Sequence, residues 1–186
     1  MAGGRLYPTG WLNGQMVPAD AVRLPMFSPG VAFAASVFEG IRGYRGADGR
    51  ANLFRLGDHL DRLEQGAAIL GLDAVPRPAD VAEAILAMLR ADGVAEDCYV
   101  RPHVYVDGEG DMAATGPTGL AILARPRPQL AARLEKGLRC QVSSWRRVSD
   151  NASPPRVKAA ANYFNGRLAG LQAKADGYDT ALILTE

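Results

Sequence analysis

The sequence predicts an α+β fold built from two domains, and three observations predict it. Segments in which apolar and polar residues alternate occur beside segments in which apolar residues recur every three or four positions, the patterns of strands and helices. Short glycine-containing turns join neighbouring strand-like segments, as they do in antiparallel hairpins. A proline-rich stretch at 125–128 separates two groups of such elements.

The first group begins with two predicted hairpins and two predicted helices. Asn13-Gly14 predicts a hairpin over 11–17, and the turn at 46–49 predicts another over 36–54. Asp58 is expected to cap a helix whose apolar residues share one face: Leu60, Leu63, Ala67 and Leu70. Gly71 is expected to end this helix, and a second helix is predicted over 79–90, ending before Gly93.

Strands predicted over 98–106 and 120–124 complete a first domain, which we expect to cover 1–124. Because two prolines in four residues oppose regular pairing, 125–134 is the predicted linker. The second domain, 135–186, is predicted to open with a strand from 138, a helix over 162–175 closed by Gly177, and a strand over 180–184. Since the chain ends directly after that strand, we expect the second domain to be incomplete.

Composition excludes several classes of protein. The 186 residues are 48% hydrophobic and 22% charged, with a formal net charge of +1, which argues against nucleic acid or an anionic membrane as the main partner. The longest apolar runs, such as 120–124, are too short to span a bilayer, and the N-terminus has no apolar signal region. Two cysteines, Cys98 and Cys140, are too few for a disulfide framework, so we expect a cytoplasmic protein. No spacing of histidine or cysteine predicts a metal site.

The strand over 98–106 carries one unusual face. Alternation places Cys98 and the valines on a core face, and it places four polar or aromatic side chains on the other: Tyr99, Arg101, His103 and Tyr105. This second face is either solvated or a pocket wall on which the arginine binds a carboxylate. Pro102 predicts an edge strand or a bulge, because it donates no backbone hydrogen bond.

Two further side chains have both a functional and a structural interpretation. Arg62 lies early in its helix, where a cation opposes the helix dipole, so it either binds an anion there or pairs with Asp58 or Glu64 on its own helix. Lys158 precedes three alanines, Asn162 and Tyr163. A lysine amine can attack a carbonyl as a Schiff-base nucleophile, whereas most single lysines are solvated surface charges.

Four ordered stretches resemble the fold-type IV, pyridoxal-phosphate-dependent aminotransferases, most closely those of branched-chain amino acids. They are Ser36-Val37-Phe38-Glu39-Gly40-Ile41-Arg42, His59-Leu60-Asp61-Arg62-Leu63, Tyr99-Val100-Arg101-Pro102, and Val142-Ser143-Ser144-Trp145 continuing to Lys158-Ala159-Ala160-Ala161-Asn162-Tyr163 and Gly177-Tyr178-Asp179. Four motifs in the family's order are more specific than any one of them, so the resemblance favours the functional interpretation of Lys158.

The resemblance implies a cofactor, pyridoxal 5'-phosphate, and roles for seven residues. Lys158 would form the Schiff base and move the substrate proton. Tyr163 would bind the phenolic oxygen of the cofactor and Arg62 its phosphate. Phe38, Tyr99 and Arg101 would face the substrates, an amino acid and a 2-oxo acid, and Arg101 suits the side-chain carboxylate of glutamate. Phe33 stands where the family has an aromatic hydroxyl that reaches across a homodimer to the substrate pocket.

The resemblance leaves other interpretations open. A D-amino acid aminotransferase and aminodeoxychorismate lyase share the same fold type. A truncated homologue that acts as a non-catalytic partner subunit is also considered, because the acidic residue expected to pair with the pyridine nitrogen lies beyond Glu186. The leading interpretation is a homodimeric branched-chain aminotransferase of the cytoplasm.

Overall fold

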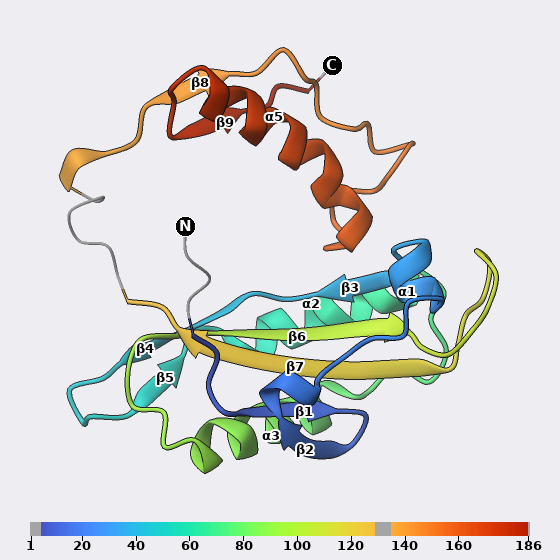
Figure 1. The fold of residues 1–186 in the computed structure, drawn as a ribbon, viewed down its shortest axis with the longest axis vertical. Coiled ribbons are helices and arrows are strands. Elements are labelled where there is room, and N and C mark those ends of the chain that lie inside the picture. Colours follow the sequence, from blue (N-terminus) through green and yellow to red (C-terminus); the bar gives the residue numbers. More distant parts are fainter. Residues whose placement is uncertain (1–4, 129–134, 186) are drawn as a thin grey trace.

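The computed structural model describes residues 5–128 and 135–185, and it contains the mixed architecture that the sequence predicts (Figure 1). A seven-stranded sheet has the order β2-β1-β7-β6-β4-β5, and β3 also pairs with β6. Its strands are β1 (Thr9–Leu12), β2 (Gln15–Pro18), β3 (Ser36–Phe38), β4 (Ile41–Arg45), β5 (Ala51–Leu53), β6 (Cys98–Val106) and β7 (Thr118–Pro126). All pairs in this sheet are antiparallel.

The first hairpin is confirmed, because β1 pairs with β2 around Asn13 and Gly14. Both turn residues have positive φ, 46° and 93°, which is the conformation that asparagine and glycine tolerate. The second hairpin is confirmed as the pairing of β4 with β5. The predicted strand from Ser36 is divided into β3 and β4, with Glu39 and Gly40 between them.

Pro102 explains that division, and the prediction of an edge strand or a bulge at Pro102 is wrong. β6 lies inside the sheet, with β7 on one side and β3 and β4 on the other, and its register with all three is continuous. The Pro102 carbonyl accepts a hydrogen bond of 3.0 Å from the Glu39 backbone nitrogen, but proline has no N–H to return. The ladder therefore loses one bond opposite Glu39, and the chain leaves strand geometry there.

Two long helices, α2 (Leu56–Ile69) and α3 (Pro78–Ala91), cover one face of the sheet. Their apolar faces join the sheet in one core cluster, which includes Leu60, Leu63, Ile85, Met88 and Val100. Both helices fall where periodicity predicts them, but the prediction that Asp58 caps α2 is wrong. The N-cap is Arg55 in a left-handed conformation, and Asp58 lies in the first turn, where its carboxylate accepts a 2.8 Å hydrogen bond from the Arg55 guanidinium.

Two short helices also belong to the first part of the chain. The 3₁₀ helix η1 (Ala19–Ala21) follows β2, and α1 (Pro29–Ala32) precedes β3. Strand β7 is longer than the predicted 120–124 and includes Arg125 and Pro126, the first residues of the predicted linker. Residues 129–134 of that linker lie outside the described residues, and the division into two domains stays a prediction.

The C-terminal part contains β8 (Cys140–Val142), the 3₁₀ helix η2 (Ala160–Asn162), α5 (Tyr163–Ala175) and β9 (Thr180–Leu182). β8 and β9 pair in parallel, and α5 packs beside them (Figure 1). The predicted helix and both strands are confirmed within a few residues, and Gly177 follows α5 with a φ of 78°. None of the helices in the described ranges combines the length and the apolar character that crossing a bilayer requires.

Residues 157–159 connect the two parts of the chain at the edge of the large sheet. Ala159 forms an antiparallel bridge with Val37, and the Phe38 backbone nitrogen donates a 3.2 Å hydrogen bond to the Lys158 carbonyl. Alternate side chains along such an extended segment point in opposite directions. Val157 and Ala159 are accordingly buried in the core, and Lys158 points the other way.

Candidate active site

A cavity of about 330 Å³ lies beside Lys158, where residues from α2, the loop before η2, and α5 meet. Its volume is within the range of small-molecule sites. Three of its lining side chains carry charge or a phenol that sequence analysis singled out, and half of the other six come from residues 155–157. The lining residues are Arg62, Arg147, Pro155, Arg156, Val157, Lys158, Asn162, Tyr163 and Gly166.

The Lys158 amine is held between two aromatic rings. Its Nζ donates a hydrogen bond to the Tyr163 hydroxyl and lies 5.0 Å from the centroid of the Phe38 ring. The Phe38 and Tyr163 rings are themselves in contact, with centroids 4.9 Å apart. Lys158 is therefore not the solvated surface lysine that is the commonest case. It is a partly buried amine at the wall of a cavity.

Asn162 holds the loop that carries Lys158. This side chain is buried, and its Nδ2 donates to the carbonyls of Val157 at 3.0 Å and Pro154 at 3.3 Å. A buried amide that satisfies two loop carbonyls stabilises one loop conformation. The asparagine therefore positions the lysine through the backbone.

Arg62 projects from α2 to the cavity, and its partner is Glu39 rather than a residue of its own helix. Its Nε and Nη2 lie 2.6 and 2.7 Å from the two carboxylate oxygens of Glu39, a bidentate pair. The interpretation that Arg62 pairs with Asp58 or Glu64 is wrong. The Arg62 side chain is half exposed, so part of its guanidinium remains open to the cavity.

Glu39 is the charged residue that sequence reasoning missed. Its carboxylate is fully buried beneath α2, and one of its oxygens lies 2.8 Å from Nδ1 of His59. Burial alone would raise the pKa of Glu39, but the hydrogen bonds and charges of Arg62 and His59 outweigh burial and lower it. A signal was present, because Glu39 alternates with the core residues Val37 and Ile41 and so falls on an apolar face.

Arg147 is a second cationic side chain of the cavity that sequence reasoning did not single out. It follows the Ser-Ser-Trp stretch, and its Nη1 donates a 3.3 Å hydrogen bond to the Asn162 carbonyl. Together with Arg62 it makes the cavity electropositive, which favours an anionic group in the ligand.

The polar face of β6 borders this site. Phe38 lies directly opposite His103 in the sheet, and the Arg101 guanidinium stacks on the Phe38 ring with its Cζ 3.8 Å from the centroid. Tyr99 and Arg101 line a second cavity of about 230 Å³. The Tyr99 hydroxyl lies against Gly40, where a Cβ would be only 2.7 Å from it. Tyr105 is fully buried, so the interpretation of a wholly solvated face is wrong.

Phe33 is not brought to either cavity within the described residues. It ends α1 and about half of its surface is exposed. The structure thus brings Tyr163 and Phe38 to the Lys158 amine and places Arg62 in the same cavity. Arg101 stacks on Phe38 and lines a second cavity with Tyr99, whereas Phe33 lies apart.

His103 makes the stability of the fold depend on pH. Burial, together with the charge of Arg101, lowers the pKa of His103 to about 4 from an unfolded value near 6.5, and its Nε2 is buried without a partner. Between these two pKa values His103 is protonated in the unfolded chain and neutral in the folded chain. The stability of the fold is therefore unaffected by this histidine above pH 6.5 and decreases as pH falls towards 4.

We expect the free energy of unfolding of wild type to decrease by about 3 kcal/mol more than that of the variant His103→Phe between pH 7 and pH 4, as measured by urea unfolding. Equal losses in the two proteins would contradict this prediction.

Among residues 5–128 and 135–185, no group of three or more histidine, cysteine, aspartate or glutamate side chains could hold a metal ion. Cys98 is buried, Cys140 is exposed, and both are free thiols.

An antiparallel sheet with helices on one face thus holds a lysine amine beside a cationic cavity, and comparison with known proteins assigns the chain to a family. The model of the family "Amino-transferase class IV" matches residues 36–186. The chain belongs to this family, and its architecture is that of fold-type IV.

Branched-chain aminotransferases are among the similar proteins, as the four motifs predict. The chain is 33% identical over 177 residues to a probable branched-chain-amino-acid aminotransferase of Rickettsia typhi, covering 94% of this chain and 58% of that protein. The structure of the Thermoproteus uzoniensis enzyme with norvaline matches with a TM-score of 0.87 and 34% identity, over 95% of this chain and 59% of that one. The Thermobaculum terrenum enzyme in its PLP-form matches with a TM-score of 0.85 and 34% identity, over 97% and 59%. The chain thus spans about three-fifths of the length of these relatives.

Proposed function

We propose that this chain is part of a pyridoxal 5'-phosphate-dependent aminotransferase that acts on branched-chain or similar apolar L-amino acids with a 2-oxo acid as acceptor. The observation that carries the proposal is the Lys158 amine, hydrogen-bonded to Tyr163 at the wall of a cationic cavity. The names of the relatives favour this substrate class over D-amino acids and aminodeoxychorismate. The arrangement around Lys158 also argues against a non-catalytic partner subunit.

The donor set of the cavity fits the cofactor. An aldehyde needs a primary amine, which Lys158 provides, and a phenolate oxygen needs a donor such as the Tyr163 hydroxyl. Guanidinium groups bind phosphate through charge-assisted hydrogen bonds, and both Arg62 and Arg147 line the same cavity as Lys158. When bound, the cofactor would withdraw electrons from the Cα of the substrate.

The residues of this chain would supply position and proton transfer. The Lys158 amine would take the proton from the substrate Cα as a general base and deliver the same proton to C4′ of the cofactor as a general acid. Phe38 would offer apolar surface to the substrate side chain, and Tyr99 would line the neighbouring cavity together with Arg101. Arg101, stacked on Phe38, would bind the side-chain carboxylate of a second substrate such as glutamate.

Borohydride reduction of the protein with its cofactor, followed by peptide mass mapping, tests this proposal. The pyridoxyl group should be found on Lys158. The chain has only two other lysines, Lys136 and Lys174, so the assignment is unambiguous. A label on either of these, or no label at all, would refute the proposed function.

We further propose a homodimer that works in the cytoplasm. Large apolar side chains are exposed near α1, with Met26 78% and Phe27 72% accessible, and such a patch favours a protein–protein contact. Two free cysteines suit a reducing compartment. Sedimentation equilibrium should give twice the chain mass, and the double variant Met26→Ser with Phe27→Ser should shift it towards the monomer. A wild-type protein that stays monomeric at all concentrations would refute the dimer.

A further inference from the structure

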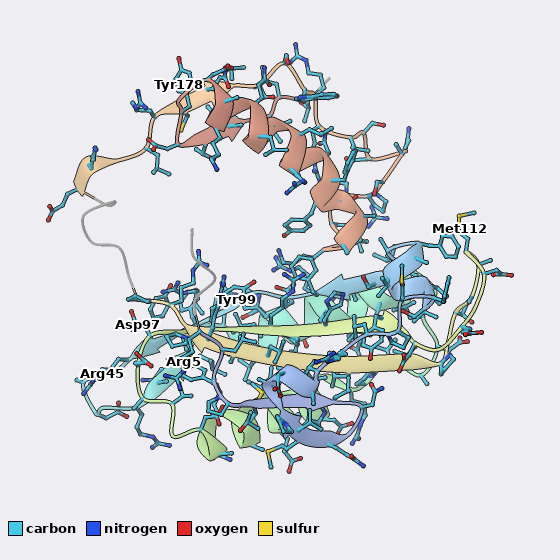
Figure 2. All side chains as sticks on the ribbon, viewed as in Figure 1. Arg5, Arg45, Asp97, Tyr99, Met112 and Tyr178 are labelled. Atoms are coloured by element: carbon cyan, nitrogen blue, oxygen red, sulfur yellow. The ribbon has the colours of Figure 1, made fainter. Side chains whose placement is uncertain are left out.

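Two guanidinium groups lie against the ring of Tyr99 at one end of the large sheet, and a third lines the same cavity as Tyr99. The Cζ atoms of Arg125 and Arg127 lie 5.5 and 5.6 Å from the centroid of the Tyr99 ring. Arg101 and Arg125 line the 230 Å³ cavity together with Tyr99. We call Arg101, Arg125 and Arg127 the arginine cluster. Figure 2 shows Tyr99 on the side of the sheet that faces the C-terminal part of the chain.

Strand register places the cluster on one face. Tyr99 of β6 lies directly opposite Arg125 of β7, and Arg101 lies opposite Leu123. Because directly opposed residues of neighbouring strands share a face, Arg125 points to the same side as Tyr99. Arg127 follows the end of β7, and its guanidinium lies near the same ring. The Arg42 guanidinium donates a 2.7 Å hydrogen bond to the Arg127 carbonyl and anchors the backbone there. Two members of the cluster therefore lie on paired strands, and the third, Arg127, directly follows β7 with its backbone N–H bonded to the Asp97 carbonyl at 2.8 Å.

The cluster has no acidic partner within the described residues. Four other arginines of the chain each form an ion pair with a carboxylate: Arg55, Arg62, Arg77 and Arg139. Arg101, Arg125 and Arg127 form none, and their side chains donate no hydrogen bond to any described group. Like charges held this close repel one another, so an anion bound among them would relieve that repulsion.

One member of the cluster, Arg101, lies within reach of the Lys158 amine. The Arg101 Cζ is 3.8 Å and the Lys158 Nζ is 5.0 Å from the centroid of the same Phe38 ring. The two groups cannot be farther apart than these two distances combined. A substrate whose Cα lies at Lys158 can therefore extend a short side chain past Phe38 to Arg101, which shares a cavity with Arg125.

We propose that Arg125 and Arg127 join Arg101 in binding the distal carboxylate of a dicarboxylic amino acid or 2-oxo acid. The inference rests on the proposed function, and it names two further residues that determine substrate specificity. Guanidinium forks bind carboxylates through paired, charge-assisted hydrogen bonds, which a branched aliphatic side chain cannot use.

Binding of glutarate and of 4-methylpentanoate, measured by calorimetry, tests the cluster without turnover. Each of Arg125→Gln and Arg127→Gln should weaken glutarate binding about tenfold, and the double variant about a hundredfold, because a hydrogen bond to a charged group is lost at each step. The affinity for 4-methylpentanoate should change less than about twofold, because its apolar chain gains nothing from a guanidinium. Arg50→Gln is the matched control, since it removes the same charge from the exposed turn between β4 and β5 and should change neither affinity.

The same variants should raise the KM for glutamate and leave the KM for leucine unchanged in the first half-reaction. Equal loss for both ligands, or glutarate binding that is unchanged in the double variant, would overturn the inference. If borohydride fixes no cofactor on Lys158 while glutarate binding still depends on Arg125 and Arg127, the proposed aminotransferase function is refuted, but carboxylate binding by the arginine cluster is supported. If borohydride fixes the cofactor on Lys158 but the double variant prefers glutarate over 4-methylpentanoate as wild type does, the inference about the arginine cluster is refuted and the proposed function is not.

Discussion

Replacing Lys158 with alanine is expected to abolish covalent attachment of the cofactor and to slow transamination at least about a thousandfold. Positioned proton transfer alone contributes about 10²- to 10⁴-fold, and covalent catalysis adds to it. No other lysine substitutes, because Nζ of Lys158 is the amine that contacts both Phe38 and Tyr163. The measurement is the single-turnover rate with leucine, followed by the absorbance of the cofactor.

Lys174→Ala is the matched control for this change. Lys174 lies exposed in the last turn of α5, away from the residues that line the cavity, and its replacement should leave the rate and the absorbance as in wild type. Lys158→Arg keeps the positive charge but cannot attack an aldehyde, so it should be as inactive as the alanine variant. A Lys158→Ala protein with a wild-type rate would remove the central residue of the proposal.

Removing the buried carboxylate of Glu39 is expected to have the largest effect on stability. The variant Glu39→Ala leaves His59 and Arg62 without their shared partner and opens a small void beneath α2. Breaking a buried ion pair on one side typically costs about 3–5 kcal/mol, and the half exposure of Arg62 places the expected loss at the lower end, about 3 kcal/mol. The midpoint of urea unfolding reports it.

Asp58→Ala is the control for Glu39, because Asp58 forms an ion pair of similar length with Arg55 in which both side chains are largely exposed. Exposed pairs contribute little, so this variant should unfold close to wild type. Should both variants lose the same stability, burial of Glu39 would not be the cause.

The Glu39 carboxylate also predicts a dependence on pH. Its pKa is lower in the folded chain than in the unfolded one, so its stabilising contribution is present above the unfolded value near 4.5 and is lost as pH falls through the folded value. The variant Glu39→Gln cannot titrate at this position. Its unfolding free energy should therefore fall less than that of wild type below the unfolded pKa of 4.5.

Local patterns in the sequence were sufficient to predict most of the helices and strands. The Asn13-Gly14 hairpin, the faces of α2 and α3, and the alternation of β6 depend on residues that are neighbours in the chain, so a short window contains the whole cause. The same patterns gave a wrong prediction where a segment distant in the chain packs against the residue. Pro102 lies in a central strand because its missing donor faces the gap between β3 and β4, which no local pattern contains.

For the candidate site, too, the sequence predicted the individual residues but not how they are arranged in space. Motifs in the sequence, compared with a known family, singled out Lys158, Tyr163, Arg62 and Arg101, because each residue type has a chemistry of its own. Their assembly depends on residues far apart in the chain, since Phe38 joins Lys158 to Arg101 through contacts with one ring.

The sequence alone determined the family, the order of most strands and helices, and the amine that we propose carries the chemistry, because these depend on residue type and spacing. Only the tertiary structure decided which charges are paired. It buried Glu39 under Arg62 and left the arginine cluster without a carboxylate among the described residues, because the neighbours of a charge are set by strand register and helix packing between distant positions of the chain.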